Sequence, residues 1–150
     1  MRAVLQRVCS ARVCVDGNCV GAIGRGLLVF LGIAEGDGDQ DQEWLLQKIA
    51  RQRLFPDSQG KMNCSVADIG GGFLVVSQFT LLASTRKGNR PSFTLAADPQ
   101  EARRRYEQCL EDLAVLSGCP VASGQFAADM QIEAHNDGPV TIVIDSRWRE

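Results

Sequence analysis

The sequence predicts one mixed α/β domain, with roughly seven strands and two long helices arranged in layers. Strand-like patterns gather towards both ends of the chain, and two amphipathic helical patterns lie between them. This order differs from the regular alternation of a doubly wound sheet, and two helices cannot cover so much strand surface. We therefore expect a layer of helices on two layers of strands. The 150 residues, of which 45% are hydrophobic and 23% charged, suffice for one buried core.

The first part of the chain predicts strands and a tight hairpin. Ala3 to Cys9 has the pattern of a first strand. Residues 11–15 and 18–22 alternate on either side of Asp16-Gly17, which is typical of a two-residue hairpin turn because both central positions need positive φ. The continuous apolar run from Gly26 to Ile33 predicts a strand that is buried on both faces.

An acidic loop precedes the first predicted helix. Asp39 or Asp41 is expected to cap this helix, which should run to about Arg53. Its apolar stripe consists of Trp44, Leu45, Leu46 and Ile49. Turn residues follow at Pro56–Gly60. A second buried strand is predicted over Phe73–Phe79, after three consecutive glycines.

The second helix is predicted to start at Asp98-Pro99, with the aspartate as cap and the proline in the first turn, and to stop at Gly118. Its expected core face consists of Ala102, Tyr106, Cys109, Leu110, Leu113 and Leu116. Two further strands are predicted, at about Gly124–Glu133 and Val140–Asp145, joined by a turn at Asn136–Pro139.

Composition narrows the class of protein. The net charge of −2 argues against a protein that wraps many phosphates, so any RNA contact should be local. The basic groups at residues 86–90 and 103–105 are by default a solvated loop and a solvated helix face. The run Gly26–Ala34 is too short to span a bilayer, and the start has no signal-peptide layout, so we expect a cytoplasmic protein without a membrane partner.

The cysteines and the histidine do not suggest a metal site or a redox motif. No Cys-x-x-Cys pair occurs, and Cys9, Cys14 and Cys19 are interpreted as small core residues in strands of a reduced protein. The single histidine, His135, lies near a predicted strand end, and a zinc site would need clustered ligands. We expect no metal and no cofactor.

Familiar catalytic motifs are absent from the sequence, but two segments are unusual. There is no Gly-x-Ser-x-Gly elbow, phosphate-binding loop or dinucleotide fingerprint. Ser77–Leu81 places polar groups at the end of a very apolar strand, and Asn136–Thr141 contains a Gly-Pro pair. An ordinary strand end and an ordinary turn are the simplest interpretations. Neither segment has a side chain that takes a proton near neutral pH, so chemistry there would use backbone donors, hydroxyls and groups of the substrate.

These two segments resemble the signature motifs of the D-aminoacyl-tRNA deacylase family, also called D-tyrosyl-tRNA deacylases. Further matching stretches occur in the family order and cover nearly the whole chain: Leu5–Val8, Gly26–Val29, Gly60–Asn63, Arg90–Phe93 and Phe126–Met130. The tail Ser146–Glu150 is longer than expected for many members.

The resemblance implies a three-layer β-β-α single domain over residues 1–150 that forms an obligate homodimer. It implies hydrolysis of the ester bond of D-aminoacyl-tRNA, with a pocket for the terminal adenosine near Ser77–Leu81 and Met130. It also implies that Gly138-Pro139 is a cis pair that reaches into the partner's pocket and excludes L-amino acids. Arg7 matches a position that helps to hold this pair.

The catalytic groups implied by the resemblance are Ser77, Gln78, Phe79 and Thr80. The backbone N–H groups of Phe79 and Thr80 are expected to meet the developing oxyanion, where one donor contributes about 3 kcal/mol. The 2′-hydroxyl of the terminal ribose is expected to help to activate water. Thr80 is interpreted as an orienting group, because its motif contains no base that would make it a nucleophile. Glycyl-tRNA is an expected second substrate, since glycine has no Cβ.

Two alternatives remain. A non-catalytic RNA-binding module would need stacking aromatics and a basic face, which 6% aromatic residues and a negative net charge disfavour. A general serine or threonine esterase would use Ser77 or Thr80 as nucleophile, and labelling by an acylating reagent would reveal it.

Overall fold

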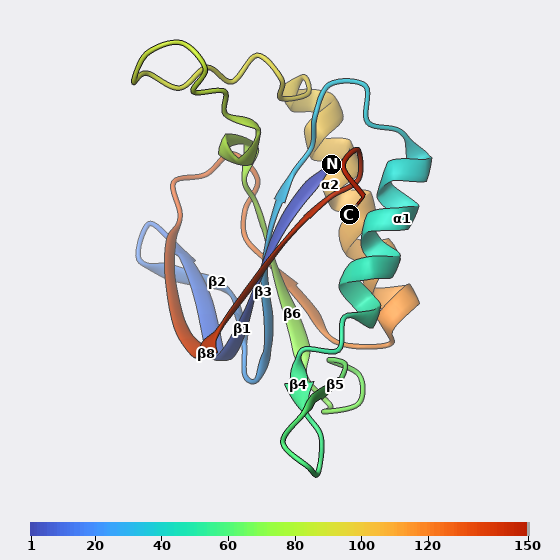
Figure 1. The fold of residues 1–150 in the computed structure, drawn as a ribbon. Helices are drawn as coiled ribbons and strands as arrows, with labels where there is room; N and C mark the ends of the chain where they lie inside the picture. The colour runs from blue at the N-terminus through green and yellow to red at the C-terminus, as the bar shows by residue number, and fades with distance from the viewer. Residues whose placement is uncertain (150) are drawn as a thin grey trace.

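The computed structural model describes residues 1–149 as one α/β domain (Figure 1). It contains eight strands in this range, one more than predicted, and two α-helices. The strands are β1 (Arg2–Val15), β2 (Asn18–Ile23), β3 (Gly26–Gly32), β4 (Phe55–Pro56), β5 (Met62–Cys64), β6 (Gly72–Ser77), β7 (Val121–Ser123) and β8 (Gln131–Asp145). The helices are α1 (Asp39–Arg51), α2 (Pro99–Ser117) and the single 3₁₀ turn η1 (Phe79–Leu82).

One curved sheet organises the molecule. Its strand order is β2-β1-β3-β6-β7, and β8 pairs with β1 outside this path. The β3–β6 and β6–β7 pairs are parallel, whereas β1 runs antiparallel to β2, β3 and β8. The edges β2 and β7 come close together: a Cβ on Gly21 would lie 2.4 Å from the Ser123 carbonyl oxygen. Only glycine permits that approach, so the sheet curls into a barrel-like shape.

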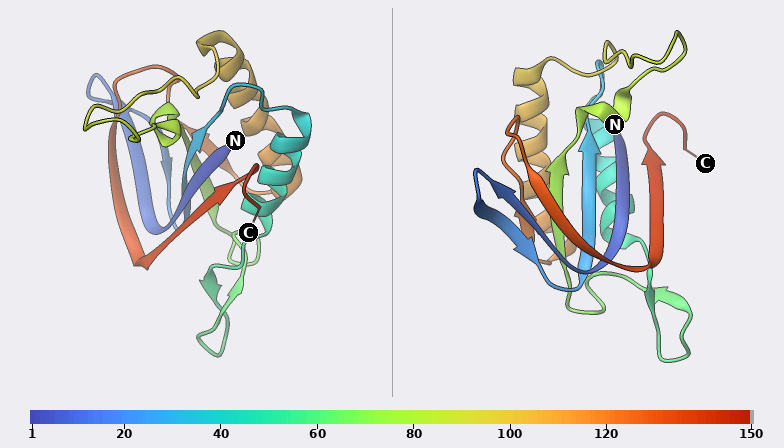
Figure 2. Two further views of the ribbon diagram at one scale, coloured as in Figure 1. Left: turned by 45° about the horizontal axis from the view of Figure 1, so that its top comes forward. Right: turned by 90° about the vertical axis from the view of Figure 1, so that its left-hand side faces the viewer.

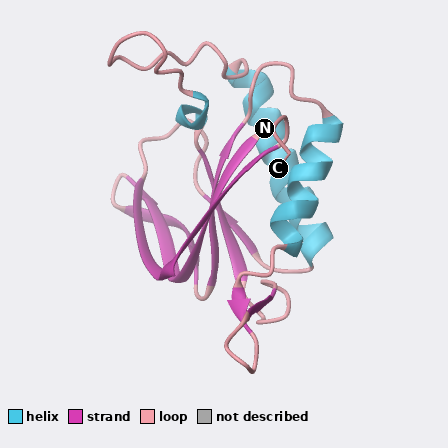
Figure 3. Ribbon diagram, in the orientation of Figure 1, coloured by secondary structure: helices cyan, strands magenta, loops and turns pink. Residues whose placement is uncertain are grey.

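The expected layering of helices on two layers of strands is confirmed (Figure 2, Figure 3). Both helices cover one face of the sheet, and the larger core between them includes Leu5, Phe73, Leu45 and Leu113. A smaller core on the opposite face is built from Val8, Ala11, Val13, Leu28, Leu74 and Val76. Strands β3 and β6 contribute to both cores, which explains why their sequences are continuously apolar.

The N-terminal predictions are largely confirmed, with two corrections. Asp16 and Gly17 have φ of 49° and 78°, as the predicted hairpin requires. The two strands predicted before the hairpin are one bent strand, because β1 pairs with β3 through its first half and with β2 through its second. Gly38 is the N-cap of α1, and Asp41 instead accepts a 3.0 Å hydrogen bond from the Gly38 N–H. That bond holds the pKa of Asp41 below its usual value.

The α2 predictions are confirmed at both helix ends. The Asp98 carboxylate accepts a hydrogen bond from the Gln100 N–H, and Gly118 has φ of 65°. Tyr106, Cys109 and Leu113 are buried as expected. Leu116 is 37% exposed, so its assignment to the core face is wrong.

The ends of two predicted strands and the position of three cysteines need correction. β6 stops at Ser77, and Phe79 belongs to η1. The short β7 was not predicted, and residues 124–130 form a loop instead of a strand. Cys9 and Cys19 are exposed and Cys14 is only half-buried, so none of them belongs to a core, because the outer strand layer has one face in solvent.

The segment Asn136–Pro139 lies inside β8 and is not a turn between strands. Val8 pairs with Asn136 and Gln6 with Thr141, so residues 137–140 form a large bulge opposite Arg7. The ladder resumes beyond the bulge because β1 continues on both sides of it. The Gly138-Pro139 peptide bond is cis.

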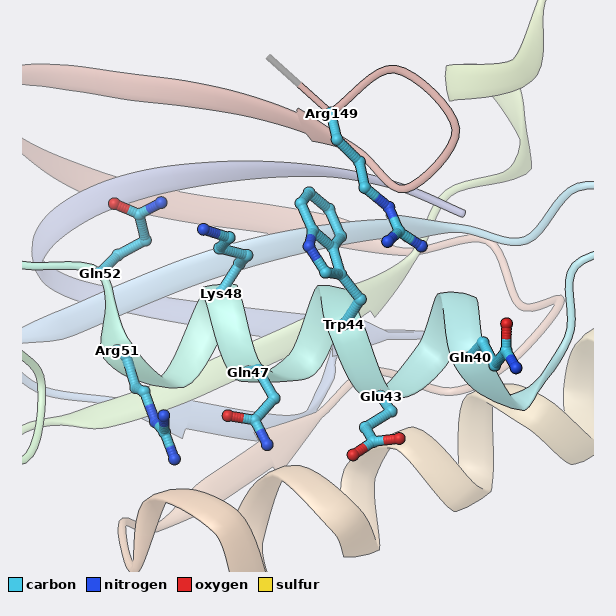
Figure 4. Close-up of a pocket in the computed structure, with 8 residues that line it drawn as sticks. All are labelled: Gln40, Glu43, Trp44, Gln47, Lys48, Arg51, Gln52 and Arg149. Atoms are coloured by element: carbon cyan, nitrogen blue, oxygen red, sulfur yellow. The ribbon is translucent and has the colours of Figure 1, made fainter.

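The C-terminal tail packs against the N-terminus and α1. Ser146 is buried and accepts a 2.7 Å hydrogen bond from the Met1 ammonium. Arg147 forms a 2.9 Å ion pair with Asp37. The Arg149 guanidinium lies 4.8 Å from the centre of the Trp44 ring (Figure 4). The last residue of the tail, Glu150, lies outside the described residues. None of the described helices is long and apolar enough to cross a membrane.

Candidate active site

A cavity of about 600 Å³ opens where β6 leaves the sheet. Its walls come from the ends of β3 and β6, from η1, from the start of α2 and the segment before it, and from the start of β8 and the loop before it. The lining residues are Leu31, Ile33, Val76, Ser77, Gln78, Phe79, Phe93, Ala96, Ala97, Pro99, Ala102, Phe126, Ala127, Ala128, Met130 and Ile132. Four predicted site residues, Ser77, Gln78, Phe79 and Met130, therefore lie together.

The backbone at this cavity changes direction after its last ladder contact. Ser77 pairs with Leu31 of β3, and the Gln78 N–H donates a 2.8 Å hydrogen bond to the Leu31 carbonyl. The chain then enters η1, whose Leu81 carbonyl accepts a 2.6 Å hydrogen bond from Arg2. The first N–H groups of a helical turn have no partner within the turn. The N–H groups of Phe79 and Thr80 occupy these positions.

Side chains around η1 form a polar and an aromatic contact. The Gln78 amide donates a hydrogen bond to the Thr80 hydroxyl. Thr80 lies beside the cavity and is not one of its lining residues. The Phe79 side chain is 57% exposed, and its ring meets the edge of Phe93 with 5.1 Å between ring centres. This arrangement offers hydroxyl, amide and aromatic surface to a ligand.

No residue in the wall of this cavity carries a side chain that titrates near neutral pH. Tyr106 lies behind the wall, 5.8 Å from the Phe126 ring, and donates a 2.8 Å hydrogen bond to the Val75 carbonyl. Burial raises the pKa of Tyr106 to about 12, and burial likewise raises the pKa of Cys109 to about 12. Both groups therefore stay protonated at neutral pH and supply no base.

The second predicted segment is held by Arg7. The Arg7 guanidinium donates hydrogen bonds of 3.1 Å to the Asp137 carbonyl and 2.6 Å to the Leu54 carbonyl. It also forms a 3.2 Å ion pair with the Asp137 carboxylate. Gly138 and Pro139 are exposed beyond this anchor, and Gly138 has φ of 132°. The predicted supporting position of Arg7 thus corresponds to direct contact with the bulge.

The structure does not bring the two segments together within one chain. Arg7 pairs with Leu27 near the start of β3, whereas Ser77 pairs with Leu31 near its end. Four residues of strand separate these points by about 13 Å. Figure 1 shows the bend of β8 and the turn η1 at opposite ends of the sheet.

Several lining residues were not predicted as site residues, above all Phe93, Ala96, Ala97 and Phe126. They come from irregular segments, whose position over the sheet is set by a few backbone contacts. The Ala97 N–H donates a 3.0 Å hydrogen bond to the Ile33 carbonyl, for example. The sequence feature that could have indicated Phe93 and Phe126 is the aromatic residue in each of the short matching stretches Arg90–Phe93 and Phe126–Met130.

A second hollow, of about 740 Å³, lies along the outer face of α1 (Figure 4). It is lined by Gln40, Glu43, Trp44, Gln47, Lys48, Arg51, Gln52 and Arg149, and contains none of the predicted site residues. Within residues 1–149, no group of three or more His, Cys, Asp or Glu side chains is arranged to hold a metal.

Comparison with known proteins agrees with the motifs and the fold. A family model described as D-Tyr-tRNA(Tyr) deacylase matches residues 4–145. Proteins named D-aminoacyl-tRNA deacylase from Opitutus terrae and Akkermansia muciniphila are 57% and 55% identical to the chain over 150 residues, which cover each protein completely.

Solved structures show the same fold. The c-Myc DNA Unwinding Element Binding Protein superposes with a TM-score of 0.90 and 42% identity, over 97% of this chain and 98% of that one. A probable eukaryotic D-amino acid tRNA deacylase, 17% identical, superposes with a TM-score of 0.81 over 96% and 98% of the two chains, and shows the likeness of fold alone. The family model matches residues 4–145, and relatives that align over their full length are more than half identical to the chain. The chain therefore belongs to the D-Tyr-tRNA(Tyr) deacylase family.

Proposed function

We propose that this protein hydrolyses the ester bond of D-aminoacyl-tRNA, releasing the amino acid and the tRNA. The observation that carries the proposal is the cavity at the end of β6, whose 600 Å³ fall within the range of small-ligand sites. Its aromatic and apolar walls suit a nucleoside, and the polar side chains of the wall are those of Ser77 and Gln78. Family membership and the names of the relatives support the same reaction. The substrate also assigns the protein to the cytoplasm, where aminoacyl-tRNA is used.

The reaction proceeds by attack of water without a protein nucleophile. The ester carbonyl lies against η1, where the N–H groups of Phe79 and Thr80 donate to the oxyanion that develops. Gln78 orients the Thr80 hydroxyl through their hydrogen bond. The 2′-hydroxyl of the terminal ribose orients the water, whose proton passes to the departing 3′ oxygen. An aminoacyl ester is activated, so this modest assistance suffices.

The complete site is a joint product of two copies of the chain. Gly138-Pro139 is exposed and lies far from the cavity of its own chain, so a second copy is needed to bring the two together. In this homodimer the Gly138-Pro139 backbone occupies the space that an L-oriented Cβ would need. Rejection of this kind protects L-aminoacyl-tRNA from hydrolysis. It does not discriminate between the side chains of different D-amino acids. Glycine has no Cβ, so glycyl-tRNA is also a substrate.

A paired hydrolysis assay tests the function. D- and L-aminoacyl-tRNA with the same side chain are incubated with the purified protein in metal-free buffer. We expect hydrolysis of the D-form and of glycyl-tRNA, and resistance of the L-form. Equal hydrolysis of both enantiomers would refute rejection by Gly138-Pro139, and no hydrolysis of either would refute the activity.

A further inference from the structure

A basic hairpin projects from the molecule beside the cavity. We define the basic loop as residues 85–91; it contains Arg86, Lys87 and Arg90. Ser84 and Ser92 close its base with two backbone hydrogen bonds, of 2.8 and 3.0 Å. The yellow-green loop of Figure 1 extends from the end of the sheet where η1 lies.

The charge of this loop is uncompensated. No acidic residue occurs between Asp68 and Asp98, although the chain as a whole has a net charge of −2. Arg86, Lys87 and Arg90 are exposed, and within residues 1–149 none of them forms an ion pair. Three positive charges on a narrow hairpin are available to an anionic ligand.

The base of the loop adjoins the cavity wall. The chain passes from Ser92 directly to Phe93, which lines the cavity and contacts Phe79. It then runs through Ala96 and Ala97, which pair with Ala34 and Ile33 just after β3. The loop therefore lies next to one side of the cavity, where a chain of nucleotides whose last nucleoside occupies the cavity can reach it.

Other basic surfaces fit this role less well. Arg104 and Arg105 on α2 form ion pairs with Glu101, and Arg105 also pairs with Asp39. Lys48 of α1 and Arg149 of the C-terminal tail lie over the Trp44 ring, and neither α1 nor the tail contributes a residue to the cavity (Figure 4).

We infer that the basic loop binds the phosphodiester backbone of the single-stranded 3′ end of tRNA, next to the nucleoside held in the cavity. The inference rests on the proposed function and adds a contact that recognises phosphate and not base. An acidic protein needs few such contacts, because the cavity supplies the remaining affinity. Each single-strand phosphate contact adds a slope of about −0.7 to the dependence of log K on log salt concentration.

The test compares two substrates that differ in their phosphates. The triple variant Arg86→Gln/Lys87→Gln/Arg90→Gln is assayed on D-aminoacyl-tRNA and on D-aminoacyl-adenosine, which has no phosphate. On tRNA we expect a rise of about tenfold in KM at low salt, an unchanged kcat and a shallower salt dependence of kcat/KM. On the nucleoside ester the variant and the wild type should react alike.

Two controls make the result specific. The triple variant Lys48→Gln/Arg51→Gln/Arg149→Gln removes the same charge from the hollow along α1 and should behave as wild type on tRNA. The variant Arg86→Lys/Arg90→Lys keeps the charge and should keep the affinity.

A loop triple variant with the same salt dependence as the wild type would overturn the inference. The proposed function would still be upheld by hydrolysis of D-aminoacyl-tRNA by the wild-type protein. Equal losses of the loop variant on both substrates would also overturn the inference, because the loop would then act on the pocket and not on phosphates.

Discussion

Thr80 lies beside the proposed reaction centre, where its hydroxyl has an amide as hydrogen-bond partner but no side chain that could act as a base. Its hydroxyl accepts a hydrogen bond from Gln78, and the cavity wall contains no titratable side chain. A nucleophilic hydroxyl needs an adjacent group that takes its proton. The geometry therefore supports an orienting role.

Replacing Thr80 tests this role. We expect Thr80→Ala to keep measurable turnover, with kcat lowered by less than about 100-fold, since backbone N–H groups supply most of the stabilisation. Substrate with a 2′-deoxy terminal ribose should lose more than that. Single-turnover hydrolysis of both substrates by both proteins provides the comparison. Abolished turnover in Thr80→Ala, together with normal reaction of the deoxy substrate, would establish a nucleophile.

Gly138 is the position in the bulge where a substitution is least tolerated. Its φ of 132° is unfavourable for any other residue, and an added Cβ would lie 2.8 Å from the Val140 nitrogen. We expect Gly138→Val to abolish hydrolysis of D-aminoacyl- and glycyl-tRNA, because in the proposed homodimer the side chain displaces the bulge and fills the partner's cavity. Gly24→Ala, at a site with no atom within 4 Å of the added Cβ, is the control and should be fully active. Full activity of a folded Gly138→Val protein would contradict the assigned role.

At the scale of elements, α2 is attached to the sheet by a polar contact inside an apolar layer. The Tyr106 hydroxyl donates to the Val75 carbonyl of β6, directly behind the cavity. This bond lies between two elements that both carry lining residues, so it positions the wall without touching the substrate. Loss of the bond should affect stability more than chemistry.

The variant Tyr106→Phe measures that contact. We expect a decrease in the free energy of unfolding of about 1 kcal/mol, since the buried Tyr106–Val75 hydrogen bond is lost while the Val75 carbonyl keeps its 3.1 Å hydrogen bond from the Gly124 N–H. The pKa of Tyr106, raised to about 12, means that the wild type loses stability as pH rises from the unfolded value near 10 through 12. Tyr106→Phe should show a smaller loss, with Cys109 still contributing. Urea unfolding at neutral and alkaline pH tests both statements, and identical alkaline losses would exclude Tyr106 as a source.

At the scale of the whole molecule, the two parts of the proposed site lie at opposite ends of one chain. The cavity lies at the end of β3 that contains Leu31, and Gly138-Pro139 is anchored near Leu27. In a dimer with two-fold symmetry each copy donates its bulge and receives the other. Activity should therefore depend on association.

Mixing two inactive variants tests the shared site. Ala128→Trp should fill the cavity, and Gly138→Val should disable the bulge, so each protein alone is expected to be inactive. After dissociation and mixing in equal amounts, random pairing should restore about a quarter of the wild-type sites, each with one intact cavity and one intact bulge. Activity on D-aminoacyl-tRNA and the mass in solution are measured together. If the mixture contains heterodimers and stays inactive, the site is complete within one chain.

The sequence by itself determined much of the local structure. The Asp16-Gly17 hairpin, the apolar runs of β3 and β6, and both ends of α2 follow from turn chemistry, periodicity and capping, which act over a few residues. The two motifs were also visible in the sequence, because each is contiguous. Ser77, Gln78, Phe79 and Met130 meet in one cavity as expected.

Only the tertiary structure decided how these pieces combine. β1 is one strand because it pairs with two different neighbours, and Asn136–Pro139 is a bulge in β8 because the ladder with β1 resumes beyond it. Phe93 and Phe126 joined the cavity through loops whose path depends on distant contacts. The separation of Gly138-Pro139 from the cavity also depends on which ends of β3 the two segments adjoin. Such relations are set by pairing between residues far apart in sequence, which local patterns do not record.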